Sequence, residues 1–586
     1  MDIDNTLQKF WELENVQSNT KLEPEDDQVE KHFLATHSRD ENGKYVVELP
    51  FNTESPEFGE TLHGALKRFK SVERRLQQNE QLRTQGKRYW ESLLSSPPPS
   101  ARPKTASGPS IQRDLFAVCL RFRMNKFAFS ADIVKMFRQI WVNEKQRNYQ
   151  KIVWREDPSD PIKHFQLCTV TYGTSCAPFL AVRVLEQLAV DHQDEYLNAS
   201  KILLEDFYVD DVLTGSNNED ELRRNRDELI QLMSRANLEL GKWVSNTSFI
   251  QKDDTNAQSS PVKVLGLYWD PGKDILTYNI GLAANPDCTK RQVLSDVSRI
   301  FNPLGLLALI VIQFKIIFQK LWLLYLDWDD PLPTKLADNW LMWRADLDTL
   351  QKFQLPRFIA NDADNIELHG FSDASTKAYA AVVYSRVTND DGSISVSLVA
   401  AKTRVAPLKQ QSLPRLDLCA ALLLSQLIRS ISSALRHKNI TVFAWSDSSI
   451  VLSWLSYAPA QLKTFVGNRT SETLDTLPRK AWRHVDSKSN PADCASRGLM
   501  AADLIDFHLW WNGPLWLRDQ DQYLVKLNDS RFGLSLSDKR IQGEVKSNCL
   551  ATVAVATQVH PLDELIARVS SWLKLVHIVA YVKRFI

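Results

Sequence analysis

Residues 206–215 read DFYVDDVLTG, in which two adjacent carboxylates, Asp210 and Asp211, stand between hydrophobic runs. Like charges side by side repel each other, and a turn between two strands confines them further. A divalent cation relieves that repulsion, and hard oxygen ligands suit magnesium. A third carboxylate, Asp132, ends the separate run FAFSAD (127–132). The three could together hold two metal ions for a phosphoryl transfer, whereas the plain alternative is a charged turn in water.

The composition is that of an ordinary globular protein with several domains. The chain has 586 residues, of which 44% are hydrophobic and 24% charged, and this excludes a wholly disordered chain. Its 71 basic side chains balance 71 acidic ones, so net charge alone indicates no nucleic-acid binder. Seven cysteines without a C-x-x-C pair indicate neither a disulfide framework nor a zinc knuckle.

The hydropathy pattern predicts no membrane segment. The most apolar run, residues 304–318, contains Gln313 and Lys315 and falls short of the about 20 residues that a membrane helix needs. The N-terminus lacks a basic-then-apolar signal layout. We therefore expect a soluble, intracellular protein, in the cytoplasm or the nucleus, without a membrane partner.

Hydrophobic periodicity predicts strands and helices along most of the chain. We expect strands over 45–49, 127–133, 166–172 and 262–269, two short strands within 203–213 that turn at 205–208, and helices over 62–94, 178–190 and most of 288–350. Further on, we expect strands 367–373, 378–386 and 393–402, then helix 416–435, strand 440–446, helix 449–457 and strand 482–486. Strands first and alternating elements afterwards predict a mixed sheet with helices on its faces.

A second set of carboxylates lies at the ends of these later elements. Its members are Asp373 in FSDAS, Asp417 in LPRLDL, Asp447 in WSDSS and Asp493 in NPADCASRG. Four carboxylates at element ends suit two-metal hydrolysis of a phosphodiester. Each of them could instead be a helix cap, Asp417 most of all.

The first set of carboxylates, Asp132, Asp210 and Asp211, belongs to a block of sequence that resembles the palm of a reverse transcriptase. Its motifs are close to those of the BEL/Pao group of long-terminal-repeat retrotransposons. The matching stretches, in the family's order, are GPSIQRDLFAVCLRFR (108–123), ADIVKMFRQIWV (131–142), LCTVTYGTSCAPFLAVRVL (167–185), DFYVDDVLTG (206–215), LELGKWVSN (238–246) and VLGLYWD (264–270). The resemblance implies that Asp132, Asp210 and Asp211 are the catalytic aspartates and metal ligands.

The same resemblance implies a set of substrate-binding residues. Phe137 takes the position of a bulky ring that blocks a ribose 2′-hydroxyl, and Lys242 that of a lysine near the leaving phosphate. The others are Gly173 and Pro178 in the turn before the template-facing helix, Tyr208, and Gly266 in the primer grip. On their own, Phe137 could be a core residue and Lys242 an exposed one.

The second set resembles a ribonuclease H domain, which follows the polymerase in such elements. Asp373, Asp417, Asp447 and Asp493 would then be catalytic metal ligands. His484 would help product departure, although a lone histidine there could simply end a strand. The family usually carries glutamate where this chain has Asp417, whose side chain is shorter by about 1.5 Å. That difference loosens a metal ligand or requires a bridging water.

The resemblance also implies the cofactors and partners. We expect two Mg²⁺ ions per active site, an RNA template, a DNA primer and an RNA–DNA hybrid, and deoxynucleoside triphosphates if the polymerase works. The sequence leaves the oligomeric state open.

The resemblance predicts a multi-domain α/β (α+β) fold in six parts. They are a pre-fingers segment (1–94), a Pro/Ser-rich junction (95–110), the palm (111–280), a helical thumb or connection (281–360), an RNase H-like domain (361–505) and a C-terminal segment leading to an integrase (506–586).

The family's fingers carry basic residues, whereas the junction offers only Arg102 and Lys104, so we expect the fingers to be mostly deleted. No Asp-Ser-Gly or Asp-Thr-Gly and no His/Cys zinc set occurs, so we expect protease and integrase to be missing, with SSWLKLVHIVAYVKRFI (570–586) as a shortened lead-in.

Three hypotheses remain open. The first is an RNA-directed DNA polymerase with an attached ribonuclease H, in an incomplete copy. The second is a catalytically inactive retrotransposon remnant that could still bind nucleic acid. The third, a structural scaffold, has only the neutral net charge in its favour.

Overall fold

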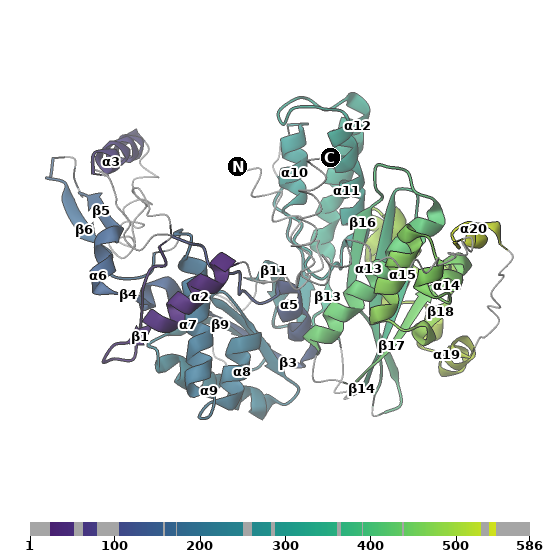
Figure 1. Cartoon of the computed structure of the whole chain (residues 1–586), viewed down its shortest axis with the longest axis horizontal. Coiled ribbons are helices and arrows are strands. Elements are labelled where there is room, and N and C mark those ends of the chain that lie inside the picture. Colours follow the sequence, from purple (N-terminus) through teal and green to yellow (C-terminus); the bar gives the residue numbers. More distant parts are fainter. Residues whose placement is uncertain are drawn as a thin grey trace, which may run out of the picture.

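The computed structural model describes most of the chain (Figure 1). The described residues are 24–51, 62–78, 105–155, 157, 159–171, 173–249, 261–282, 287–359, 365–389, 391–435, 439–528 and 538–546. The expectations for residues 79–104, which include most of the junction, and for the lead-in 570–586 lie outside the described residues.

A four-stranded antiparallel sheet, in the order β7-β8-β3-β9, forms the centre of the first half of the chain. Its strands are β3 (Phe127–Ile133), β7 (Phe207–Tyr208), β8 (Asp211–Ser216) and β9 (Leu240–Ser245). Helices α7 (Ala177–His192), α8 (Leu197–Glu205) and α9 (Glu219–Ser234) contribute to its buried core. Because β3 is an interior strand, Asp132 has a sheet partner on both sides.

A smaller lobe stands apart from this sheet, at the left of Figure 1. It contains the hairpin β5 (Lys151–Trp154) and β6 (Lys163–Gln166), helix α3 (Leu62–Gln78) and helix α6 (Glu144–Arg147). Phe69 of α3 packs edge-on against Trp154, with ring centroids 5.6 Å apart, and Arg155 pairs with Glu73 at 2.8 Å. Helix α2 (Pro24–Thr36) packs on α7 through Phe33 and Phe179. A three-stranded sheet is formed by β1 (Ser38–Arg39), β2 (Tyr45–Val47) and β4 (Trp141–Val142).

A second four-stranded sheet and several helices connect the two halves of the chain. They are β10 (Val262–Val264), β11 (Leu267–Asp270), β12 (Ile275–Thr277) and β13 (Leu355–Pro356), with α5 (Leu115–Met124), α10 (Lys290–Val297), α11 (Ala308–Leu323) and α12 (Thr334–Asp346). The fully buried Arg357 donates to both oxygens of Asp274, at 2.6 and 2.9 Å. Arg123 donates to the carbonyl oxygens of Arg357 and Leu398 at 3.2 and 3.1 Å. These two guanidinium groups link α5 to this sheet and to the next one.

The second half of the chain is built on a five-stranded mixed sheet in the order β16-β15-β14-β17-β18. Its strands are β14 (Asn365–Ala374), β15 (Ala378–Thr388), β16 (Ile394–Val405), β17 (Asn439–Ser446) and β18 (Trp482–His484). β14, β15 and β16 pair antiparallel, whereas β14, β17 and β18 pair parallel. The predicted mixed sheet is confirmed.

Helix α13 (Leu413–Ala434) covers one face of this sheet. Gly370 of β14 permits the close approach of α13 to the sheet, because a Cβ at Gly370 would lie 2.5 Å from the Leu424 side chain. Among the described residues, α13 is the one helix long and apolar enough to cross a membrane, and 56% of its apolar window is buried inside the protein. This degree of burial is typical of a helix that packs against the core of a globular protein.

Shorter helices complete the second half. They are α14 (Ser449–Trp454), α15 (Thr464–Thr476), α16 (Pro491–Arg497), α17 (Ala501–Ile505), α18 (His508–Asn512), α19 (Gln520–Leu527) and α20 (Lys539–Gln542). The 3₁₀ helices among the described residues are η1 (Met136–Gln139), η2 (Asn148–Gln150), η3 (Leu347–Lys352), η4 (Pro459–Gln461), η5 (Arg479–Ala481), η6 (Ser487–Ser489) and η7 (Leu515–Leu517). Residues beyond 505 share the sheet's core: Trp510 is fully buried, and Tyr384 Oη donates to its carbonyl oxygen at 2.7 Å.

Of the two short strands predicted within 203–213, the first is wrong. Residues up to Glu205 belong to α8, whose buried Ala199, Ile202 and Leu203 are spaced as on a helix face. A short apolar run does not distinguish helix from strand by periodicity alone. The hairpin turn lies at Val209–Asp210 instead of 205–208.

Two further strand predictions are wrong in extent. The strand predicted over 166–172 ends at Gln166, because the Val170 N–H donates to the carbonyl of Ile140 instead of extending the β5–β6 ladder. Residues 262–269 form two strands, since Leu265 and Gly266 both have positive φ, 46° and 89°. A two-residue turn of this kind reverses the chain.

Candidate functional site

The β3–β8 pairing brings Asp211 next to Asp132. The two residues are cross-strand partners, and such partners have Cβ atoms about 4.5–5.5 Å apart. The N–H of Ile133 donates to the carbonyl oxygen of Asp210 at 2.8 Å, which holds the turn against β3. The structure thus brings Asp132, Asp210 and Asp211 together at one end of the sheet, and we call them the first carboxylate site.

The turn of this site has an unusual backbone. Tyr208 and Asp211 pair across it, so the loop consists of Val209 and Asp210. Val209 has φ of +60°, which is an outlier for a β-branched residue. Such strain persists where the surroundings enforce it, and it clusters at functional sites.

The carboxylates of the first site destabilise one another's charge. Burial, followed by the charges of Asp210 and Asp132, raises the pKa of Asp211 to about 6. The Lys242 ammonium opposes this effect and contacts Asp132 Oδ2. The hydrogen bond to Asp132 in turn raises the pKa of Lys242.

The donor chemistry of the first site fits a divalent cation. Asp132 Oδ1 is buried without a hydrogen-bond partner, and three carboxylates supply hard oxygen ligands. Within the described ranges, however, no three His, Cys, Asp or Glu side chains are already gathered around an ion-sized space. In the present arrangement, Lys242 is the cation at Asp132.

The other predicted substrate residues occupy turns and element ends. Phe137 lies in η1, half-buried against the core, and Gly173, with φ of +83°, precedes α7. Pro178 lies in the first turn of α7. Gly266 occupies the β10–β11 turn, where a Cβ would lie 2.8 Å from the Phe301 ring. Two of the predicted substrate residues contact an aspartate of the first site directly. Tyr208 is the strand partner of Asp211, and Lys242 forms an ion pair with Asp132.

Two parallel strands bring Asp373 and Asp447 side by side. Ser372 of β14 pairs with Ser446 of β17, so the next residues along both strands lie at the same sheet edge, on strands about 4.8 Å apart. His484 ends β18 opposite Ser446. Burial lowers the pKa of His484, although its backbone hydrogen bond with Asp447 acts in the opposite direction.

Asp417 and Asp493 reach the same edge from two helices. Asp417, the fifth residue of α13, bonds with the side chain of Ser448 and the backbone of Ala374. Asp493 of α16 pairs with Arg497 at 2.7 Å, and its charge acts on Asp373. Asp373, Asp417, Asp447 and Asp493 therefore form a second carboxylate site.

Burial and mutual repulsion also disfavour charge at the second site. Burial first, and then the charge of Asp447, raises the pKa of Asp373, while a hydrogen bond from Ser496 Oγ at 2.9 Å lowers it. Burial raises the pKa of Asp417 to about 7, with a further contribution from Asp447. A cation would favour ionisation of both groups at neutral pH, so this donor set also fits a divalent ion.

Sequence reasoning missed three residues that position the second site. Asn490 is fully buried, donates to the Ser372 carbonyl at 3.1 Å and caps α16. Ser487 Oγ donates to Asp447 Oδ2 at 2.5 Å, and Ser496 binds Asp373. Asn490 before a proline is a recognisable helix start, whereas nothing in the sequence marks the two serines.

Two family models match the chain, one around each site. Residues 71–268 match the model described as reverse transcriptase (RNA-dependent DNA polymerase), and residues 289–448 match that described as Pao retrotransposon-like RNaseH-like domain. The first match contains the first carboxylate site. The second contains Asp373, Asp417 and Asp447, whereas His484 and Asp493 follow it. No curated protein matches the chain.

Among solved structures, the chain is similar to two of foamy viral origin. The protease-reverse transcriptase dRH in complex with ds DNA is 14% identical, with 63% of this chain and 59% of that chain covered and a TM-score of 0.43. The protease-reverse transcriptase in complex with RNA/DNA hybrid is 11% identical, with 64% and 46% covered and a TM-score of 0.43. This chain therefore spans 59% and 46% of the length of these two proteins.

Proposed function

We propose that this chain, which carries a reverse transcriptase domain followed by a Pao retrotransposon-like RNase H-like domain, is an RNA-directed DNA polymerase with an associated ribonuclease H. The observation that carries the proposal is that each matched region contains carboxylates of one site, which the sheet register brings together at strand ends. Two phosphoryl-transfer sites in one chain suit a protein that copies RNA into DNA and removes the copied RNA.

We assign two Mg²⁺ ions to each site. Asp132, Asp210 and Asp211 would hold them in the first, and Asp373, Asp417, Asp447 and Asp493 in the second. When bound, the ions stabilise the charge that develops during phosphoryl transfer and align the reacting oxygens. The unpaired Oδ1 of Asp132 and the raised pKa values of Asp211, Asp373 and Asp417 support this assignment, because they mark negative charge that lacks compensation.

The polymerase substrates would be an RNA template, a DNA primer and deoxynucleoside triphosphates. The Lys242 side chain is 83% exposed, so its ammonium can leave Asp132 for a nearby phosphate. The half-buried Phe137 ring lies five residues after Asp132, which suits a rigid wall against a ribose 2′-hydroxyl. We assign Tyr208, Gly173, Pro178 and Gly266 to contacts with template, primer or nucleotide.

The nuclease substrate would be the RNA strand of an RNA–DNA hybrid. His484 has a lowered pKa, so it is neutral at pH 7 and can accept a proton or a hydrogen bond from a departing product. Ser487 and Ser496 hold Asp447 and Asp373 in place through the bonds described above.

A second candidate is a nucleic-acid-binding remnant without polymerase activity. Residues 95–110, SSPPPSARPKTASGPS, contain only Arg102 and Lys104 as basic residues where a triphosphate clamp is expected. This favours a copy whose fingers are mostly deleted and whose palm carboxylates are intact.

Primer extension on an RNA template, with the purified chain, Mg²⁺ and deoxynucleoside triphosphates, tests the polymerase. We expect little extension, because alignment of the reactants contributes about 7–11 kcal/mol to such steps and we propose that most of the fingers clamp is deleted. Asp210→Asn should remove what remains, whereas Asp220→Asn, an exposed carboxylate in the first turn of α9, should not. Extension that survives Asp210→Asn would contradict the assigned site, and robust extension would contradict the loss of the fingers.

A further inference from the structure

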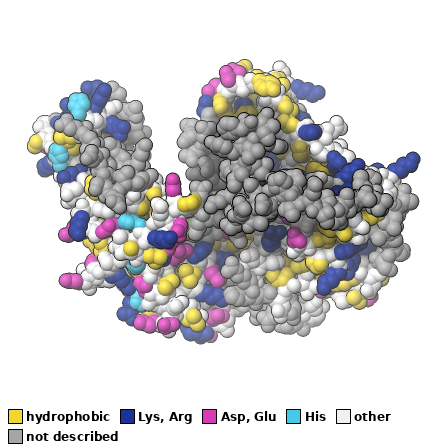
Figure 2. All heavy atoms as spheres, in the orientation of Figure 1, with side chains coloured by type: hydrophobic (Ala, Val, Ile, Leu, Met, Phe, Trp, Pro, Cys, Tyr) yellow, Lys and Arg dark blue, Asp and Glu magenta, His cyan; other side chains and the backbone are white. Residues whose placement is uncertain are grey.

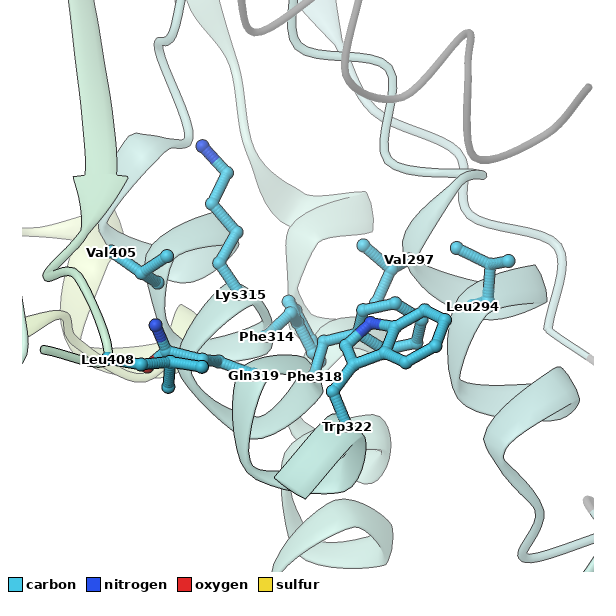
Figure 3. A pocket seen from close by; sticks show the side chains of 9 residues that line it. All are labelled: Leu294, Val297, Phe314, Lys315, Phe318, Gln319, Trp322, Val405 and Leu408. Carbon is cyan, nitrogen blue, oxygen red and sulfur yellow. The ribbon is translucent and has the colours of Figure 1, made fainter. Parts of the chain in front are cut away.

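An apolar cavity lies between α10, α11 and the end of β16 (Figure 3). Its volume is about 270 Å³, which exceeds the about 150 Å³ of a protein cavity known to bind benzene. None of its lining residues belongs to either carboxylate site. Phe314, Phe318 and Trp322 supply its aromatic wall.

The polar side chains that line the cavity are already bonded elsewhere. Lys315 Nζ donates to the carbonyl oxygen of Thr403 at 2.8 Å and points away from the aromatic wall in Figure 3. Gln319 Nε2 donates to the carbonyl oxygen of Ala406 at 2.8 Å. The cavity therefore favours an apolar occupant over a polar one.

The cavity continues into an exposed apolar surface. Trp322 is 46% exposed and Leu408 is 64% exposed, and the neighbouring Leu323, Leu324 and Tyr325 are exposed as well. Figure 2 shows hydrophobic side chains gathered at the top of the view, around the ends of α11 and α12. Contiguous apolar surfaces of this kind mark interaction sites.

A segment of the same chain has the matching chemistry. Residues 562–586, LDELIARVSSWLKLVHIVAYVKRFI, lie outside the described residues and contain neither Gly nor Pro. Apolar residues recur at steps of three and four: Leu562, Leu565, Val569, Trp572, Val576 and Val579. This pattern predicts an amphipathic helix, and Pro561 suits its first turn.

The last described residues lie within reach of the cavity's rim. Glu544 pairs with Arg415 at 2.7 Å, and Arg415 follows Leu408 by seven residues, which span at most about 25 Å. Lys546 is fixed by a backbone bond to Gln461 at 2.8 Å. The 16 residues from Lys546 to Leu562 can extend about 50 Å, so the segment can reach the cavity.

We propose that residues 562–582 form an amphipathic helix that docks its apolar face on this surface, with the Trp572 indole in the cavity. A buried indole fits the available volume and covers Trp322 and Leu408 from water. The proposal is independent of both catalytic assignments.

Hydrogen–deuterium exchange of the full chain, followed by mass spectrometry at two protein concentrations, tests the docking. We expect protected amides in 562–582, and exchange there and in α11 at least about tenfold faster in Trp572→Asp, since burial of one large apolar side chain accounts for such a factor. Leu408→Asp, on the cavity side, should deprotect 562–582 in the same way. Lys574→Asp, on the opposite side of the predicted helix, should leave both regions unchanged.

Two results would overturn the proposal. One is exchange of 562–582 at the rate of a free peptide in the unsubstituted chain. The other is protection that appears only at the higher concentration together with a dimer in sedimentation, which would assign the surface to a second copy. Peptides from β14 and β17 report whether each variant is folded, and if Trp572→Asp disturbs them, the Leu408→Asp result decides.

Discussion

Asp211 carries a charge that the fold disfavours and the proposed chemistry requires. Burial and two neighbouring aspartates raise its pKa to about 6, so the folded protein binds this proton more tightly than the unfolded chain. The resulting destabilisation of the fold is complete above about pH 6, decreases as the pH falls towards the ordinary aspartate value of 3.8, and is absent below that value. The motif predicted the three aspartates, whereas the Lys242–Asp132 contact joins residues 110 positions apart, and such a contact follows only from the folded sheet.

Asp211→Asn should stabilise the metal-free protein at pH 8. We expect about 1 kcal/mol, less than the full pKa shift implies, because the carboxylate is partly exposed and water screens it. At pH 5 the difference should shrink, since Asp211 is then protonated in the folded protein. Thermal unfolding in EDTA at both pH values measures the effect, with Asp220→Asn as the control. An equal gain at pH 5 and pH 8 would show that repulsion is not its cause.

Asp417→Glu should raise cleavage of the RNA strand in a hybrid. The Asp417 carboxylate bonds with Ser448 and Ala374, and the longer side chain adds about 1.5 Å of reach towards Asp373 and Asp447. We expect an increase of severalfold in the Mg²⁺-dependent rate, and none for Asp475→Glu, an exposed aspartate on α15. An unchanged or lower rate for Asp417→Glu would refute the assigned ligand role.

Element by element, the predictions succeed where one periodicity dominates. Strand 127–133 is observed with the predicted bounds, and helix 178–190 lies within α7. They fail where a short apolar run suits both helix and strand, as at α8, or where two residues with positive φ break a run, as at Leu265 and Gly266. The β5–β6 hairpin escaped prediction because its burial pattern does not alternate regularly.

The proposed deletion of the fingers is testable by replacement. Grafting a family fingers segment in place of residues 95–110 should restore primer extension, because basic side chains would hold the triphosphate against the palm carboxylates. Within residues 95–110, only Arg102 and Lys104 carry a positive charge that could hold a triphosphate. Asp210→Asn in the grafted chain should abolish extension again. A graft that folds and binds nucleotide yet remains inactive would contradict this explanation.

At the scale of the whole molecule, long-range contacts decide the architecture. Trp510, Trp516 and Tyr523 are buried, and Trp510 Nε1 donates to the Leu306 carbonyl at 2.9 Å. We therefore propose that the RNase H-like unit extends beyond the predicted boundary at 505 to at least Leu527. The sequence did not indicate this, because tryptophans in a loop-rich stretch carry no periodic signal.

Arg357→Ala should destabilise the connection between the two halves. The substitution leaves Asp274 and the carbonyl groups of Asn125 and Lys126 without their buried partner. We expect a loss of about 3–5 kcal/mol in the free energy of unfolding, as for other broken buried ion pairs. Chemical denaturation measures it, with Arg540→Ala as the control, since Arg540 forms an exposed pair with Asp538. A loss below about 1 kcal/mol would show that Arg357 does not hold the halves together.

The most direct test of the central claim is Mg²⁺-dependent cleavage of the RNA strand of an RNA–DNA hybrid by the full chain. We predict slow but measurable cleavage that Asp447→Asn abolishes and Asp210→Asn preserves, because the two carboxylate sites lie in different sheets. The absence of cleavage by both the unsubstituted chain and Asp417→Glu, or cleavage that persists in Asp447→Asn, would contradict the account.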